Sequence, residues 1–123
     1  MLKVNFFHTC DYAIIEAATG KITIIGIFEN INAERFPAMQ AKMSMVIGFE
    51  GDPNTDYDLE LATLDEKEDI IKIPFRIKTG ENGKVNWIQN IIGYQIPREL
   101  TQKILVKHDN QTIHSSYLTL NKN

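Results

Sequence analysis

Two residues near the amino end have the side chains that a nucleophilic site needs. His8 and Cys10 are separated by one residue, so on a β-strand their side chains point to the same face. A cysteine beside a base is the arrangement of a thiol hydrolase. Same-face neighbours on one strand seldom meet in attack geometry, however, and the surrounding residues offer no evident oxyanion donor. The pattern therefore favours a small buried cysteine over a catalytic one.

The histidines raise a second hypothesis, a zinc site. His108 and His114 flank a predicted turn at Asp109-Asn110, so they could face each other on paired strands, with His8 as the third ligand. The sequence has none of the closely spaced ligand pairs that are typical of zinc sites. A one-residue slip in this hairpin would also move its side chains to the opposite face. Surface histidines beside a turn are the favoured interpretation, and we predict no bound metal and no other cofactor.

Acidic residues raise a third hypothesis, a calcium site. Loops at one end of a β-sandwich can gather carboxylates around a hard cation. The residues concerned are Asp52, Asp56 and Asp58, and Asp65, Glu66, Glu68 and Asp69 with Lys67 among them. Their spacing matches no calcium-binding loop, so solvated loops are favoured. The sequence also lacks a phosphate-binding loop, a dinucleotide-binding glycine pattern and a serine elbow, and we predict that the protein is not an enzyme.

The elements that would position these residues centre on two apolar runs, Tyr12–Ala17 and Lys21–Ile31. The second run is rich in isoleucine, whose branched side chain suits a pleated strand. Gly20, between the runs, adopts positive φ at little cost, so we expect a tight hairpin there. Gly26 interrupts one face of the second run and predicts a bulge or a close approach of another backbone segment.

Both faces of the second run are apolar. Ile22, Ile24 and Phe28 share one face, and Ile25, Ile27 and Ile31 share the other. Such a strand is buried on both faces, or is buried on one and covered by a partner on the other. A later stretch repeats the pattern, with Trp87 and Ile91 on one face and Ile88 and Ile92 on the other. We therefore place Trp87 in the core and predict an interaction surface formed by Ile24, Phe28, Ile88 and Ile92.

The same region resembles a family of small bacterial proteins of uncharacterised function. Its members share a D-x-A opening, a G-K turn, an I-G-I-F strand and an F-P exit. The matching residues are Cys10-Asp11-Tyr12-Ala13, Gly20-Lys21, Ile25-Gly26-Ile27-Phe28, Ile31 and Phe36-Pro37. The resemblance implies a compact β-sandwich, and it is clearest over residues 10–50. These motifs are structural in type, so they transfer no catalytic or binding residue.

The rest of the chain is predicted to form further short strands. Alternating apolar residues indicate strands over 39–49, 57–61, 71–77, 85–92, 104–108 and 112–120. Residues 3–9 form either a first strand or a lead-in to the hairpin. We expect turns at 51–54, 79–83 and 109–110, a charged connection at 65–69 and one helical turn at 97–100. Pro74 marks an edge strand or a bulge. These patterns predict a single domain, residues 1–123, folded as an all-β antiparallel sandwich of about eight strands, Ig-like or related.

Composition narrows the choice of partner. Thirteen basic against sixteen acidic residues give a net charge of −3, which argues against nucleic acid and anionic membranes. No apolar run approaches the roughly 18 residues of a membrane span, and the amino end lacks the pattern of a signal peptide. Cys10 is the only cysteine, so an intrachain disulfide is excluded and a cytoplasmic location is expected.

These observations favour a non-catalytic binding or assembly module. We expect it to contact a protein partner or a second copy of itself, and no small-molecule ligand is identifiable. Two alternatives stay open. One is a structural component of a phage or secretion assembly, for which β-sandwiches are common building blocks. The other is a small metal-dependent or Cys/His hydrolase built on His8, Cys10, His108 and His114.

Overall fold

The structure is a computed structural model that describes residues 1–65 and 68–123. Its strands are β1 (Lys3–Ile15), β2 (Ile22–Ile27), β3 (Asn30–Ala33), β4 (Ala38–Glu50), β5 (Asp56–Asp65), β6 (Glu68–Lys78), β7 (Lys84–Ile96), β8 (Leu100–His108) and β9 (Gln111–Lys122). The described residues contain no helix that is long and apolar enough to cross a membrane. Two residues of the predicted charged connection, Glu66 and Lys67, lie outside the described part.

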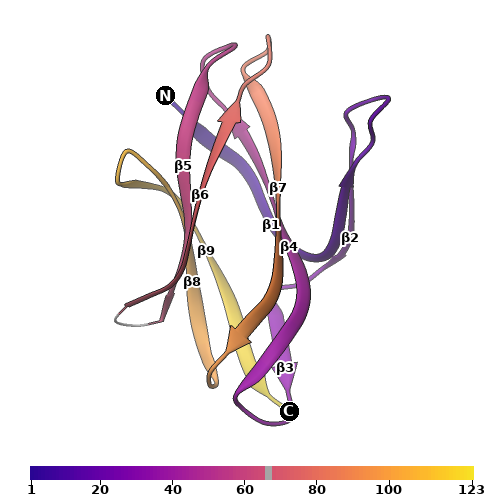
Figure 1. The fold of residues 1–123 in the computed structure, drawn as a ribbon, viewed down its shortest axis with the longest axis vertical. Coiled ribbons are helices and arrows are strands. Elements are labelled where there is room, and N and C mark those ends of the chain that lie inside the picture. The colour runs from indigo at the N-terminus through magenta and orange to yellow at the C-terminus, as the bar shows by residue number, and fades with distance from the viewer. Residues whose placement is uncertain (66–67) are drawn as a thin grey trace.

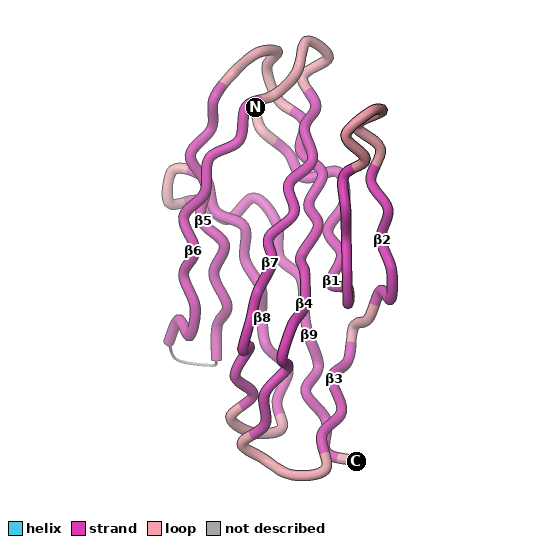
Figure 2. The backbone as a smooth tube through the Cα atoms, turned by 45° about the vertical axis from the view of Figure 1, so that its right-hand side comes forward, coloured by secondary structure: helices cyan, strands magenta, loops and turns pink. Residues whose placement is uncertain are grey.

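The nine strands form two sheets packed face to face (Figure 1). The first sheet has the strand order β2-β1-β4-β7, and the second has the order β3-β9-β8-β5-β6. Neighbouring strands are antiparallel, except that β3 pairs with β9 in parallel. Figure 2 shows the strands joined by loops and turns, with no helix drawn in the described backbone. The predicted all-β sandwich is therefore confirmed, with nine strands.

The main core lies between the sheets. The inward face of β4 supplies Met43, Met45, Ile47 and Phe49, all essentially inaccessible to solvent. The residues between them on the opposite face are buried too, so this strand is not half-buried as its alternating pattern predicted. Trp87 packs against this core as predicted, with its ring stacked on Phe75 at 5.1 Å between centroids. The core also contains a polar contact between the sheets, because the hydroxyl of Tyr94 on β7 donates a hydrogen bond to Gln102 on β8. Burial raises the pKa of Tyr94 to about 12.

The predicted turns are present, but one of them has an unexpected role. Asp109 and Asn110 both have positive φ, 51° and 62°, as a two-residue hairpin requires. Gly20 is also left-handed, at 71°. The turn at residues 79–83, which contains Asn82-Gly83, does not form a hairpin within one sheet. It carries the chain from β6 in the second sheet to β7 in the first.

One expectation needs correction. The helical turn predicted at 97–100 is wrong: residues 97–99 bend between the sheets, and Leu100 begins β8. Arg98 there makes a bidentate ion pair with Asp65, at 2.6 and 2.7 Å. Residues 3–9 form a strand, which is continuous with the first strand of the hairpin. Pro74 lies on β6, the edge strand of the second sheet, as predicted.

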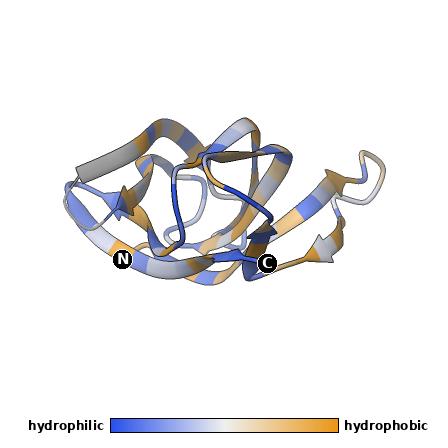
Figure 3. Ribbon diagram, turned by 90° about the horizontal axis from the view of Figure 1, so that it is seen from below, coloured by the Kyte–Doolittle hydropathy of each residue, from blue (hydrophilic) through white to orange (hydrophobic). Residues whose placement is uncertain are grey.

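A second apolar cluster covers the outer face of the first sheet. Beyond Cys10, β1 leaves β4 and pairs only with β2, and the resulting hairpin extends sideways from the sheets (Figure 3). One face of this hairpin packs onto the sheet. The cluster consists of buried Cys10, Ala13 and Val46, with half-buried Phe6, Ile22, Ile24 and Ile88 around them. Cys10 is thus fully enclosed within this second cluster.

Within this cluster the ring of Phe6 lies directly over Gly48. A methyl group added at Gly48 would overlap the ring carbons Cε2 and Cδ2 of Phe6. We expect Gly48→Ala to lower the free energy of unfolding by about 1–3 kcal/mol, because the ring must leave its packed position. Urea denaturation measures this change.

A double-mutant cycle with Phe6→Ala isolates the contact. In the Phe6→Ala background, Gly48→Ala should cost almost nothing. Gly80→Ala serves as a matched control, because a methyl group there meets its neighbours at an ordinary distance of 3.4 Å. An equal cost of Gly48→Ala in both backgrounds would show that the ring is not the obstacle.

Candidate functional site

The structure separates the three histidines that were considered as zinc ligands. The ring of His8 stacks on Phe6 and that of His114 on Phe7, whereas the ring of His108 meets Tyr57 edge-on. In the last hairpin, His114 lies opposite Val106 and His108 lies opposite Gln111, so the two imidazoles do not face each other. Among the described residues, no three His, Cys, Asp or Glu side chains gather as metal ligands would. The three-histidine arrangement is therefore wrong.

Cys10 lacks the properties of a nucleophile. Its side chain is fully buried, and its thiol donates to the main-chain oxygen of Ser44 at 3.6 Å. Burial raises the pKa of the Cys10 thiol, and the nearby carboxylate of Asp11 raises it further, against a smaller opposing effect of a backbone hydrogen bond at Tyr12. A thiol held neutral in this way is a poor nucleophile, because thiolate is the reactive form. The Cys/His alternative therefore lacks an activated thiol.

The acidic residues considered as a calcium site lie at two ends of β5. Asp52, Asp56 and Asp58 belong to its beginning and Asp65 to its end, and a ten-residue strand spans about 30 Å. Asp58 is paired with Arg76 at 2.7 and 3.0 Å, and these hydrogen bonds lower the pKa of the Asp58 carboxyl. Glu66 and the side chains of Glu68 and Asp69 lie outside the described part. The described carboxylates thus do not form one cage.

The most distinctive surface is the outward side of the β1–β2 hairpin. Tyr12 lies opposite Ile25, Ile14 opposite Thr23, and Cys10 opposite Ile27. Four large apolar side chains of these pairs are accessible to solvent: Tyr12 (44%), Ile14 (42%), Ile25 (54%) and Ile27 (56%). We call these four residues the hairpin face. Because the other side of the hairpin already packs onto the first sheet, both sides of these two strands are apolar.

Local features hold the hairpin in this position. Gly26 has φ of 71°, and the carboxylate of Asp11 occupies the space that the first carbon of a side chain would need at this position. The close contact at Gly26 is made by a side chain, and the β1–β2 ladder continues in register past it, which corrects the expectation of a bulge or a close backbone approach. The ammonium group of Lys42 on β4 lies 5.0 Å from the centre of the Tyr12 ring, an attractive cation–π contact. Ile92, opposite Lys42 in the ladder, is 83% exposed and extends the apolar surface onto β7.

The four residues predicted as an interaction surface have different surroundings. Ile24 and Ile88 are half-buried in the second cluster, and Phe28 is half-buried against the main core. Ile92 is exposed. Sequence reasoning chose the even-numbered face of β2, whereas Ile25 and Ile27 are the residues that point outward. The signal was the presence of isoleucine on both faces, and it carried no indication of which face the first sheet would cover.

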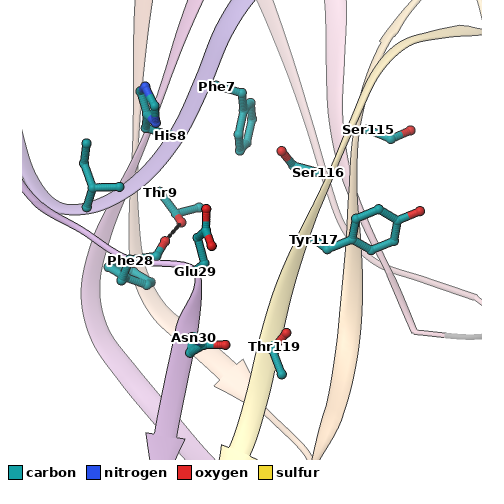
Figure 4. Close-up of a pocket in the computed structure, with 11 residues that line it drawn as sticks. Phe7, His8, Thr9, Phe28, Glu29, Asn30, Ser115, Ser116, Tyr117 and Thr119 are labelled. Atoms are coloured by element: carbon teal, nitrogen blue, oxygen red, sulfur yellow. Dashed lines mark hydrogen bonds between the residues drawn. The ribbon is translucent and has the colours of Figure 1, made fainter.

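A groove of about 380 Å³ lies beside the hairpin, between β1 and β9 (Figure 4). Its floor is the segment in which the chain leaves β2 and enters β3. The lining residues are Phe7, His8, Thr9, Ile27, Phe28, Glu29, Asn30, Ser115, Ser116, Tyr117 and Thr119. His114, just beneath, contacts the hydroxyl of Ser116 at 3.3 Å, and burial lowers the pKa of this histidine.

Comparisons with known proteins identify a family. A family model described as "Family of unknown function (DUF6941)" matches residues 5–121. Among solved structures, the chain is similar to an immunoglobulin-like protein from Pseudomonas aeruginosa, with a TM-score of 0.48 and 10% sequence identity. That similarity covers 98% of this chain and 96% of the other. The comparison with curated proteins gave no match.

Burial of Cys10 predicts that its thiol is unreactive in the native protein. We expect an aromatic disulfide reagent to react with Cys10 only as fast as the protein unfolds, and rapidly in urea, because the thiol is enclosed and neutral. Thr101→Cys, which adds an exposed thiol on β8, serves as the control and should react at once. Rapid reaction of native Cys10 would show that the cluster over the first sheet opens readily.

The surroundings of His114 predict a dependence of stability on pH. The pKa of native His114 is lowered by burial, whereas in the unfolded chain it is near 6.5, so the unfolded state takes up the proton first as pH falls. The contribution of His114 to stability is complete above about pH 7 and decreases below pH 6.5. In denaturation experiments, the difference between the wild type and His114→Gln should shrink towards acid pH. A difference that is constant from pH 7 to pH 5 would contradict this effect.

Proposed function

The chain belongs to that family of unknown function, and we propose that it is a non-catalytic binding or assembly module that acts through protein–protein contacts. The observation that supports this role is the hairpin face, in which Tyr12, Ile14, Ile25 and Ile27 are exposed together on two paired strands. Contiguous exposed apolar side chains of this kind are typical of interaction sites. We further propose that the module works in the cytoplasm, where its single thiol stays reduced.

The free edge of β2 adds a second way to make contact. In the described part of the chain, β2 pairs with β1 on one side and with no strand on the other. Its residues, Ile22–Ile27, include no charge and no proline, the features by which natural edge strands avoid pairing. Another strand could therefore add to this edge and cover the neighbouring apolar side chains at the same time.

We propose a second copy of the chain as the first occupant. Two β2 edges can pair antiparallel about a twofold axis, so that the two hairpin faces lie side by side on one continuous sheet. Such a contact is self-complementary and closes after two subunits. A contact that continues into rings or filaments would instead favour the structural role in a larger assembly.

Substitution in the hairpin face tests this proposal. We expect Ile25→Lys to weaken self-association about tenfold or more, because two like charges would then lie on neighbouring strands of the contact. Ile25 points to solvent, so the variant should keep the stability of the wild type. Light scattering across a dilution series gives the mass of each protein.

Thr101→Lys is the matched control, since it adds the same charge at an exposed position of the second sheet. Its mass should follow that of the wild type. A wild-type protein that stays monomeric at its highest soluble concentration would refute self-association. An oligomer that Ile25→Lys leaves intact would exclude the hairpin face as its interface.

A further inference from the structure

The chain crosses from the first sheet to the second within two residues. The N–H of Phe28 donates to the oxygen of Thr9 on β1 at 2.9 Å, and the hydroxyl of Thr9 returns a hydrogen bond to the oxygen of Phe28. The next residue, Glu29, accepts from the N–H of Thr119 on β9 at 3.0 Å. Phe28 therefore belongs to the first sheet and Glu29 to the second. Figure 4 shows this crossing below the groove.

Above the crossing, the edge of β9 has no neighbour among the described strands. β3 pairs with β9 only over Thr119–Lys122. Alternate residues of a strand direct their N–H and C=O groups to the same side. Thr119 directs its N–H towards Glu29, so Ser115 and Tyr117 direct their own N–H and C=O groups to that same edge of β9. The residues from Gln111 to Leu118 include no Asp, Glu, Lys, Arg or Pro. This edge thus lacks the usual protection against strand addition.

The opposite wall of the groove is also a strand edge. β1 pairs with β4 over residues 3–10, whereas β2 joins its other side only from Cys10 onwards. By the same alternation, Phe7 presents its N–H and C=O to this open side, two residues before Thr9. The rings of Phe7 and His114 stack with 5.4 Å between their centroids, and this pair closes the base of the groove between the two sheets. The groove therefore lies beside two open strand edges, in a position that one further strand could occupy and that no described strand fills.

The side chains of the groove define what it would accept. Phe7, Ile27 and Phe28 provide apolar contact, and hydroxyl groups come from Thr9, Ser115, Ser116, Tyr117 and Thr119. Glu29 carries the one carboxylate in this lining, and no Lys or Arg is present to neutralise it there. A segment with apolar or small residues and one Lys or Arg opposite Glu29 matches this surface in shape and charge.

We propose that the groove between β1 and β9 binds an extended segment of a partner polypeptide, which adds to the edge of β9 in line with β3. Its main chain pairs with the N–H and C=O groups of Ser115 and Tyr117. Its inward side chains contact Phe7 and Phe28, and a basic side chain reaches Glu29. Main-chain pairing provides affinity in this mode of recognition, while the alternate side-chain pockets provide selectivity. The site does not include Ile25 or the outer edge of β2.

Selection of peptides tests the proposal. A library of random peptides of about ten residues, the upper range of strand length, is displayed on phage and selected on the immobilised protein. We expect the selected peptides to contain a conserved Lys or Arg and to protect the amide hydrogens of Ser115 and Tyr117 from exchange. Ser115→Pro removes one N–H from the open edge and leaves the pairing of β9 with β8 in place, because proline is tolerated on edge strands. It should weaken binding about tenfold or more.

Two variants control for other causes. Ser115→Ala removes only the hydroxyl and should bind within about twofold of the wild type, since the main chain makes the contact. Glu29→Lys leaves the fold intact at an exposed position and should abolish binding of the basic peptides. Ile25→Lys should bind peptides normally, which separates this site from self-association through the hairpin face.

Three results would overturn the proposal. One is a set of selected peptides that bind Ser115→Pro as tightly as the wild type. Another is a library that yields no peptide for this protein while a control peptide-binding domain in the same experiment yields its own ligands. The third is self-association that Ser115→Pro removes and Ile25→Lys does not, because a second copy of the chain would then occupy the groove.

Discussion

The pairing of β1 governs the rest of the structure, because its two halves have different partners. Cys10 is the junction: it faces Ser44 of β4 on one side and Ile27 of β2 on the other. Before Cys10 the strand completes the first sheet, and after it the strand builds the hairpin that covers that sheet's outer surface. Where a strand has no neighbour on one side, its N–H and C=O groups on that side lie at an open sheet edge, where they lack a strand partner. The change of partner therefore creates both an exposed hairpin and an open groove.

The width of this groove depends on how the two sheets are held against each other. Most of the core is apolar, and apolar contacts alone permit small slides between layers. The hydrogen bond from Tyr94 to Gln102 joins the first sheet to the second through fully buried groups, and a buried polar group is satisfied only in one relative position. The crossing at Phe28 and Glu29 provides the link beside the groove, because Phe28 is hydrogen-bonded to Thr9 of β1 and Glu29 to Thr119 of β9.

Local patterns in the sequence predicted the strands and turns well, because period-two burial and left-handed turn residues act over a few positions. Asp56 to Leu59, in which every second residue is buried, and Asp109-Asn110 are examples. The same patterns did not indicate which sheet a strand joins, so the Asn82-Gly83 turn gave no sign of a crossing between sheets. They also left the candidate site undecided. Ile24 and Ile25 are equally apolar, and only the fold of the hairpin onto the first sheet decides which of them is exposed.

The parallel pairing of β3 with β9 also sets an order of events during synthesis. β3 is made early, yet its only strand partner in the described structure is formed by residues 119–122. Translation supplies that partner on the order of ten seconds later. Strands β1, β2 and β4 are available for local pairing throughout this interval, but β3 is not placed and the sandwich does not close. Such pairing between distant segments is typical of slow-folding β proteins, and here a strand made some ninety residues after β3 completes the enclosure of the core.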